Sequence, residues 1–142
     1  MTQSSFAAAL PPGPLVAAGE YQPGVCNIGP EEIARRRRAG HVGLVATVAL
    51  FVALVVVGAP PIARLLVALP ATIAASGYLQ AWLRFCAGFG SRGVFNFGEV
   101  GPTEHVGDAD ARRRDRARAR QIGGAALLIG VATGIVAVML PV

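Results

Sequence analysis

Long apolar runs separated by short polar segments dominate the chain. Three windows contain almost no charged side chain: Val42 to Ala59, Leu65 to Leu83 and Ile122 to Leu140. A helix of about 18–19 residues rises roughly 27–29 Å, close to the ~30 Å hydrocarbon core of a bilayer. The pattern predicts an all-α integral membrane protein with three transmembrane helices.

The composition supports a membrane location. Hydrophobic residues make up 54% of the chain and charged residues only 15%, outside the usual range of a soluble domain. As buried helices of a soluble protein, three such windows would leave too little polar sequence to cover them.

The connections between the windows predict the topology. Pro60 and Pro61 end the first helix, so the first two helices form a tight antiparallel hairpin. All 13 basic residues are arginines, and only Arg64 falls in the hairpin turn. The positive-inside rule places the amino terminus and the second loop in the cytoplasm, with the carboxyl terminus outside a bacterial cytoplasmic (inner) membrane.

The chain divides into four segments. We expect a flexible amino-terminal tail at 1–25, which lacks the basic region of a signal peptide. A two-helix hairpin with an interfacial helix start and a Phe/Gly loop covers 26–98. A polar linker and helix at 99–121 leads to the third transmembrane helix at 122–142.

Each arginine-rich stretch is expected to be helical. Pro30 suits a first helical position, with Asn27 or Gly29 as cap, and Asp108 can cap the later stretch. Acidic residues before arginines predict i, i+4 ion pairs, which are Glu31 with Arg35, Glu32 with Arg36, and Asp110 with Arg114.

These arginines are candidates for contact with anionic lipid headgroups, at about 1 kcal/mol each. They are Arg35, Arg36, Arg37 and Arg38 before the first span, and Arg112, Arg113 and Arg114 before the third. A partner subunit with an acidic surface is the alternative. No groove-reading or aromatic-studded module accompanies the charge, so we expect no nucleic-acid partner.

The segment RFCAGFGSRGVFNFG, Arg84 to Gly98, mixes glycine with phenylalanine. Its four glycines interrupt any helix, so we expect a re-entrant or surface-hugging loop at the cytoplasmic interface. A cofactor or ion pocket is a less favoured alternative.

Small residues recur along the third window at helical spacing. They are Gly123, Ala126, Gly130 and Gly134. Such a face allows close helix approach, either onto the hairpin or onto another chain. Gln80 is the polar residue expected to hydrogen-bond between membrane helices.

Part of the chain resembles a known family. The order Asn27-Ile28-Gly29, then Ile33 and Arg36 or Arg37, a glycine-bearing hairpin and Cys86 closing the second span before a Gly-rich segment is similar to the rhodanese-associated YgaP-like transmembrane domain. The resemblance covers Cys26 to Gly98 and implies a two-helix membrane module. Ala87 stands where a proline commonly follows the cysteine, and Cys26 and the third span are additions to that pattern.

Cys26 and Cys86 are the groups able to carry chemistry. The hairpin returns both to the cytoplasmic surface, where arginines would favour thiolate, so a redox or persulfide-carrying pair is one hypothesis. Two inert side chains are the alternative. With His41 and His105 they match no compact zinc motif, and we expect no metal site.

No window carries an ionisable residue at its centre, which argues against a pump or transporter. No nucleotide loop or paired carboxylates are visible, so we expect neither an enzyme nor a cofactor. The favoured function is a small accessory or assembly subunit of a larger membrane complex, bound to other subunits or to a second copy. A membrane thiol or sulfur-handling protein using Cys26 and Cys86 is the alternative.

Overall fold

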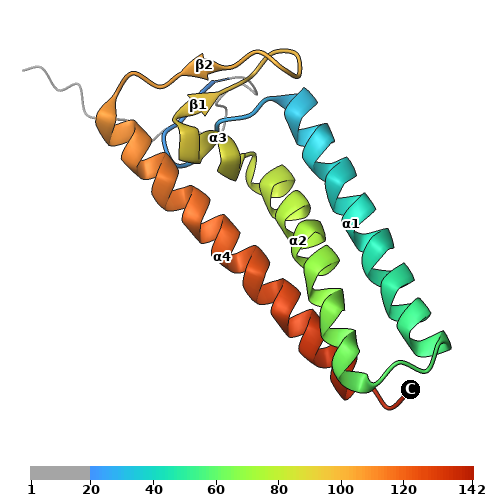
Figure 1. The fold of residues 1–142 in the computed structure, drawn as a ribbon. Coiled ribbons are helices and arrows are strands. Elements are labelled where there is room, and N and C mark those ends of the chain that lie inside the picture. Colours follow the sequence, from blue (N-terminus) through green and yellow to red (C-terminus); the bar gives the residue numbers. More distant parts are fainter. Residues whose placement is uncertain (1–19) are drawn as a thin grey trace, which may run out of the picture.

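Three long helices stand side by side and meet a small folded cap at one end (Figure 1). The structure is a computed structural model that describes residues 20–142. The long elements are α1 (Pro30–Val56), α2 (Ala68–Leu83), which follows the 3-10 helix η1 (Pro61–Val67), and α4 (Ala109–Met139). The cap, residues 20–29 and 84–108, contains α3 (Ala87–Arg92) and the antiparallel strands β1 (Val94–Phe95) and β2 (Glu104–His105).

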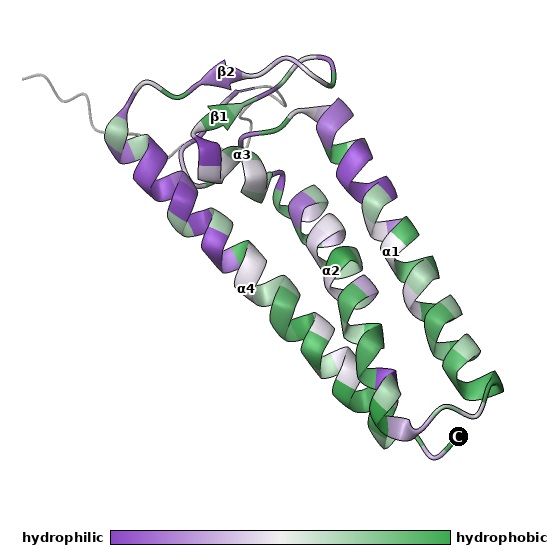
Figure 2. Ribbon diagram, viewed as in Figure 1, coloured by the Kyte–Doolittle hydropathy of each residue, from purple (hydrophilic) through white to green (hydrophobic). Residues whose placement is uncertain are grey.

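The three predicted spans are confirmed as helices long and apolar enough to cross a membrane, Pro30–Val56, Pro61–Leu83 and Ala109–Met139. Figure 2 shows hydrophobic residues along the parts of the long helices away from the cap, and hydrophilic residues in β2 and in the turns of α1 and α4 nearest the cap. At about 1.5 Å per residue, α4 is roughly 46 Å long and exceeds a bilayer core. Its arginine-rich first turns lie at the same end of the molecule as those of α1.

Helix α2 lies between α1 and α4 (Figure 1). Glycines bring α1 and α2 together, because a Cβ on Gly43 would lie 2.6 Å from the Ala74 nitrogen. A Cβ on Gly77 would likewise lie 2.5 Å from the nitrogen of Gly40. Only glycine at these positions allows this backbone approach, which is a main source of helix association in lipid.

The small face of α4 packs onto α2. Gly130 and Gly134 both face Ala68, and Ala126 is buried. The predicted face therefore lies against the hairpin, and not against another chain. Gly123 takes no part in this packing onto α2, because a Cβ there would meet no atom of residues 20–142 within 4 Å. Its place on the buried stripe is taken by Ile122.

The hairpin end is tied to the end of α4. After α1, Gly58 adopts a left-handed conformation (φ +66°) before Pro60 and Pro61. Arg64 is buried in η1 and donates to the carbonyl of Leu140 at 2.9 Å and to that of Val142. The one arginine of the hairpin turn thus donates to two backbone carbonyls at the end of the chain segment that follows α4.

The Phe/Gly segment differs from the irregular loop that was expected. Residues 87–92 form the helix α3, which begins at Cys86 and ends at Gly93 in a left-handed conformation (φ +70°). Gly90 lies within α3, where a Cβ would come 2.7 Å from the Phe85 ring and 3.0 Å from the carbonyl oxygen of Asp115. The glycine therefore allows α3 to pack against α4 and does not interrupt the helix.

Candidate functional site

Residues 20–29 form a strap that crosses the cap from α4 to α1. The Tyr21 hydroxyl and the Gly24 amide each donate to a carboxylate oxygen of Asp115, both at 2.7 Å, and Asp115 is fully buried in α4. Burial, reinforced by the Asp115 bond, raises the pKa of Tyr21 far above its usual range. Residues 20–25 therefore pack onto the cap, in contrast to the flexible tail expected there; residues 1–19 lie outside the described residues.

Asn27 connects the strap to the segment between α2 and α3. Its side-chain oxygen accepts from the Cys86 amide at 2.6 Å, and its side-chain nitrogen donates to the Cys86 carbonyl at 3.1 Å. Its backbone amide donates to Arg84 and its carbonyl accepts from Asn96. Asn27 is thus a buried crosslink within the cap, whereas Gly29 takes the cap position of α1.

The sulfur of Cys86 lies in a polar niche at the start of α3. It accepts from the Arg36 guanidinium at 3.0 Å and from the Phe89 amide at 3.4 Å. Cys86 is only 2% exposed and packs with Ile28, Phe89 and Val94. The site thus places the nucleophilic sulfur of Cys86 beside the guanidinium cation of Arg36, and apolar side chains cover the sulfur from solvent.

Arg36 also binds Glu32, one turn earlier in α1. Its Nη2 lies 3.4 Å from a Glu32 oxygen, and the Arg35 Nη1 lies 3.7 Å from the other. The predicted Glu32–Arg36 pair is confirmed, but Arg35 contacts Glu32 and forms no ion pair with Glu31 within residues 20–142. Because Glu32 is buried and is shared by two guanidinium groups, the cluster keeps one net positive charge.

Cys26 has a different environment from Cys86. It is half-buried, and its thiol donates to the Ile28 carbonyl at 3.8 Å. Burial raises the pKa of the Cys26 thiol, and the smaller opposing effects of the Ile28 backbone and the Arg84 charge do not offset it. The expectation that arginines favour a thiolate is therefore wrong at Cys26. Both cysteines lie in the cap, but each is free and no hydrogen bond joins them.

The candidate headgroup arginines separate into bound and exposed groups. Arg112 donates to the carbonyls of Val106 and Gly107, both at 2.8 Å, and so holds the cap to α4. Arg113 pairs with Asp110 at 2.6 Å, which replaces the predicted Asp110–Arg114 pair. The remaining members of the group are exposed on the helix surfaces, namely Arg35, Arg37, Arg38 and Arg114.

Gln80 stabilises the end of α2. Its side-chain nitrogen donates to Ser76, and its oxygen accepts from the Ala87 amide at 2.9 Å. It therefore joins α2 to α3, whereas a bond between membrane helices was expected. His41 lies 2.6 Å from the Tyr78 hydroxyl, a polar contact between α1 and α2.

The buried polar residues Asn27 and Asp115 were missed as site residues. Asp115 is an acidic position within the run ARRRDRARAR, and this break in the charge pattern was its only signal. Asn27 was read as a helix cap because it precedes Pro30 closely. In both cases the decisive partner lies more than 50 positions away along the chain.

Within residues 20–142, no group of three or more histidine, cysteine or acidic side chains is placed to hold a metal ion. No protein-family model matches the chain, and no curated protein or solved structure shows significant similarity to it.

Proposed function

We propose that this protein is a small accessory or assembly subunit of a larger bacterial membrane complex. The observation that carries the proposal is the open arrangement of the long helices, in which α1 and α4 flank α2 on opposite sides. An open row leaves its outer helices free to pack against other helices. On this proposal the chain is neither an enzyme nor a cofactor carrier.

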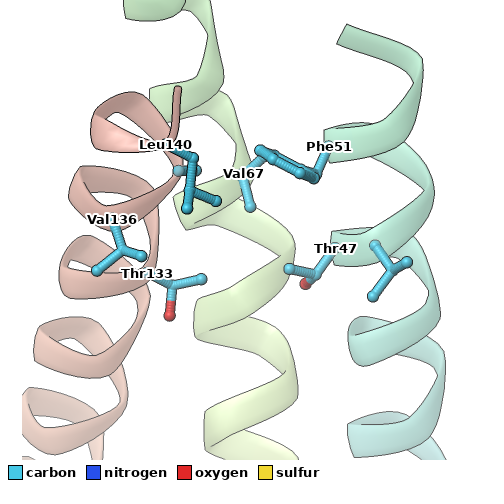
Figure 3. A pocket seen from close by; sticks show the side chains of 8 residues that line it. Thr47, Phe51, Val67, Thr133, Val136 and Leu140 are labelled. Carbon is cyan, nitrogen blue, oxygen red and sulfur yellow. The ribbon is translucent and has the colours of Figure 1, made fainter. Parts of the chain in front are cut away.

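A groove between α1 and α4 supports this role. It measures about 200 Å³ and lies near the hairpin end, over Val67. Figure 3 shows its lining side chains, which include Thr47 and Phe51 from α1 and Thr133 and Val136 from α4. The Thr47 and Thr133 hydroxyls donate to carbonyls of their own helices, so their protons are already used. The groove therefore suits an apolar helix of a partner subunit that binds through van der Waals packing.

The exposed arginines supply a second contact. In our proposal the cap lies in the cytoplasm and the hairpin end lies outside, because the arginines gather at the cap. Arg37, Arg38 and Arg114 then face anionic headgroups or an acidic partner.

Purification from the native membrane in mild detergent, followed by mass spectrometry of intact complexes, tests the proposal. We expect stoichiometric larger subunits to accompany the wild-type protein. Thr133→Phe fills the groove and is expected to release them, whereas Leu128→Phe, at an exposed position of α4, should retain them. Recovery of the wild-type protein only as a monomer would contradict the proposal.

A second candidate function, the membrane thiol or sulfur-handling role, is favoured by the contact between Arg36 and the Cys86 sulfur. In this role Cys86 accepts the outer sulfur of a persulfide donor: Cys86–SH and R–SSH give Cys86–SSH and R–SH.

Mass spectrometry of the protein after incubation with glutathione persulfide tests this second candidate. We expect a gain of one sulfur atom at Cys86, lost in Cys86→Ser and retained in Cys26→Ser. An unmodified Cys86, or modification of Cys26 alone, would remove the basis for this function.

A further inference from the structure

A second cleft lies between α1 and α2, closer to the cap. It measures about 290 Å³, and Arg36 and Ala39 line it from α1. On the α2 side its lining includes Ile73, Ser76 and Gln80. The cleft is therefore polar near the cap. Toward the middle of the helices it is lined by Ile73 and by Thr72, whose hydroxyl donates to the Ala68 carbonyl of its own helix at 2.8 Å.

The polar part offers hydrogen-bond donors to an anion. The Arg36 Nη2 is used by Glu32 and Cys86 and the Nε is buried, so the Nη1, which donates to no atom of residues 20–142, is the donor left for an anion. The Ser76 hydroxyl oxygen accepts from Gln80 at 2.8 Å, which leaves its proton free to donate. Because Glu32 neutralises only one of its two arginine partners, the local charge favours a negatively charged ligand.

The position of the cleft matches the depth of a lipid. Arg36 lies six residues, about 9 Å, before the apolar run that begins at Val42. This distance places its guanidinium at the level of the headgroups. Ile73 lies seven residues before Gln80 in α2, about 10 Å deeper in the hydrocarbon. The cleft thus follows the direction of a phospholipid, with its cation at the headgroup and its apolar part beside an acyl chain.

We propose that this cleft binds one anionic phospholipid, with the phosphate at Arg36 and Ser76 and one acyl chain along Ala39 and Ile73. The site differs from diffuse attraction to the exposed arginines, because its cation is held in place by Glu32 and Cys86. It is also independent of the groove between α1 and α4.

Titration of the full-length protein in detergent with phosphatidylglycerol, with bound lipid counted by native mass spectrometry, tests the proposal. We expect one tight lipid, and at least about tenfold weaker binding of phosphatidylcholine with the same acyl chains. Arg36→Gln should weaken phosphatidylglycerol binding at least about tenfold. The matched control Arg37→Gln removes the same charge from an exposed position of the same turn and should leave the tight lipid bound.

Ala39→Phe fills the cleft without changing the charge, and it decides the question if Arg36→Gln fails to fold. We expect it to abolish the tight lipid. Unchanged binding in Ala39→Phe, or equal losses in Arg36→Gln and Arg37→Gln, would overturn the proposal. Competition by inorganic phosphate would instead indicate a free-anion site, and a co-purified helix in the cleft would indicate a protein partner; either result also contradicts it.

Discussion

Asn27 shows how one short side chain can organise the cap. Its amide group forms a reciprocal pair with the backbone of Cys86, in the manner of two adjacent strands, and is completely buried. The loss of such a partner leaves backbone groups without hydrogen bonds in a place that water does not reach. The position of Cys86 beside Arg36 therefore depends on Asn27.

Replacement of Asn27 by alanine should lower the free energy of unfolding by about 2–5 kcal/mol, because two buried backbone groups of Cys86 lose their partners. Asn96→Ala is the matched control. Among residues 20–142, the Asn96 side chain bonds only Gly98 and Glu99 of its own loop, so the loss in free energy of unfolding should be about 1 kcal/mol. Reversible unfolding in mixed detergent micelles measures both values, and equal losses would contradict the special role of Asn27.

The pH response of Cys26 follows from its burial. Because burial raises the pKa of the folded thiol, the thiol form stabilises the fold up to the unfolded pKa of about 8.5. This contribution is lost as the pH rises through the higher folded pKa. In Cys86→Ser, we therefore expect alkylation of Cys26 by iodoacetamide to reach half its maximal rate above pH ~8.5. A midpoint below that of the detergent-unfolded protein would mean that the Arg84 charge outweighs burial.

Local contacts were predictable from sequence, and distant ones were not. Asp108 caps α4 as expected, accepting from the Ala111 amide at 2.8 Å, because a cap and its target lie within four residues. Asp110 pairs with Arg113 and not with the predicted Arg114, because positions i+3 and i+4 both lie on the same helix face. Asn27 and Gly29 are both cap candidates from sequence, and the true partner of Asn27, Cys86, is reached only when the hairpin closes.

Among the helices and strands, charge-free windows located the three long helices well. The helix starts were also predictable, because Pro30 and Asp108 carry local signals. Helix α3 was not predictable, since its glycines weaken helix propensity. The structure shows that α3 is held by packing, with Phe85 buried and Gly90 pressed against α4.

Glycine contacts should control the association of α1 with α2. Gly77→Ala would place a Cβ 2.5 Å from the Gly40 nitrogen and 2.8 Å from the Arg36 carbonyl oxygen. We expect this overpacking to destabilise the fold by about 1–3 kcal/mol. Gly124→Ala in α4 is the control, because its Cβ would meet open space and alanine raises helix propensity. Thermal unfolding in one detergent should show a lower midpoint for Gly77→Ala only; a lower midpoint for both would contradict helix contact as the cause.

In the molecule as a whole, the small face of α4 determines where the third helix packs. The sequence showed this face but left open whether α2 or another chain would cover it. Ala68 lies against Gly130 and Gly134 in the structure, so the face is used within the chain. The surface left for a partner helix is the groove between α1 and α4.

The orientation of the whole molecule gives the last prediction. Arginines gather at the cap, and the hairpin end carries only the buried Arg64. We therefore expect the cap to lie in the cytoplasm. In intact cells that express a variant with both native cysteines replaced by serine, a membrane-impermeant maleimide should label Pro60→Cys, which lies in the hairpin turn between the first two apolar windows. It should label Glu104→Cys in β2 only after the membrane is opened. Both positions are exposed, so accessibility within the protein does not limit either reaction. Labelling of Glu104→Cys in intact cells would mean that the cap lies outside the cytoplasm, the reverse of the expected topology. Both cysteines would then lie outside the reducing cytoplasm, and a disulfide or a secreted partner would replace the persulfide chemistry considered for Cys86.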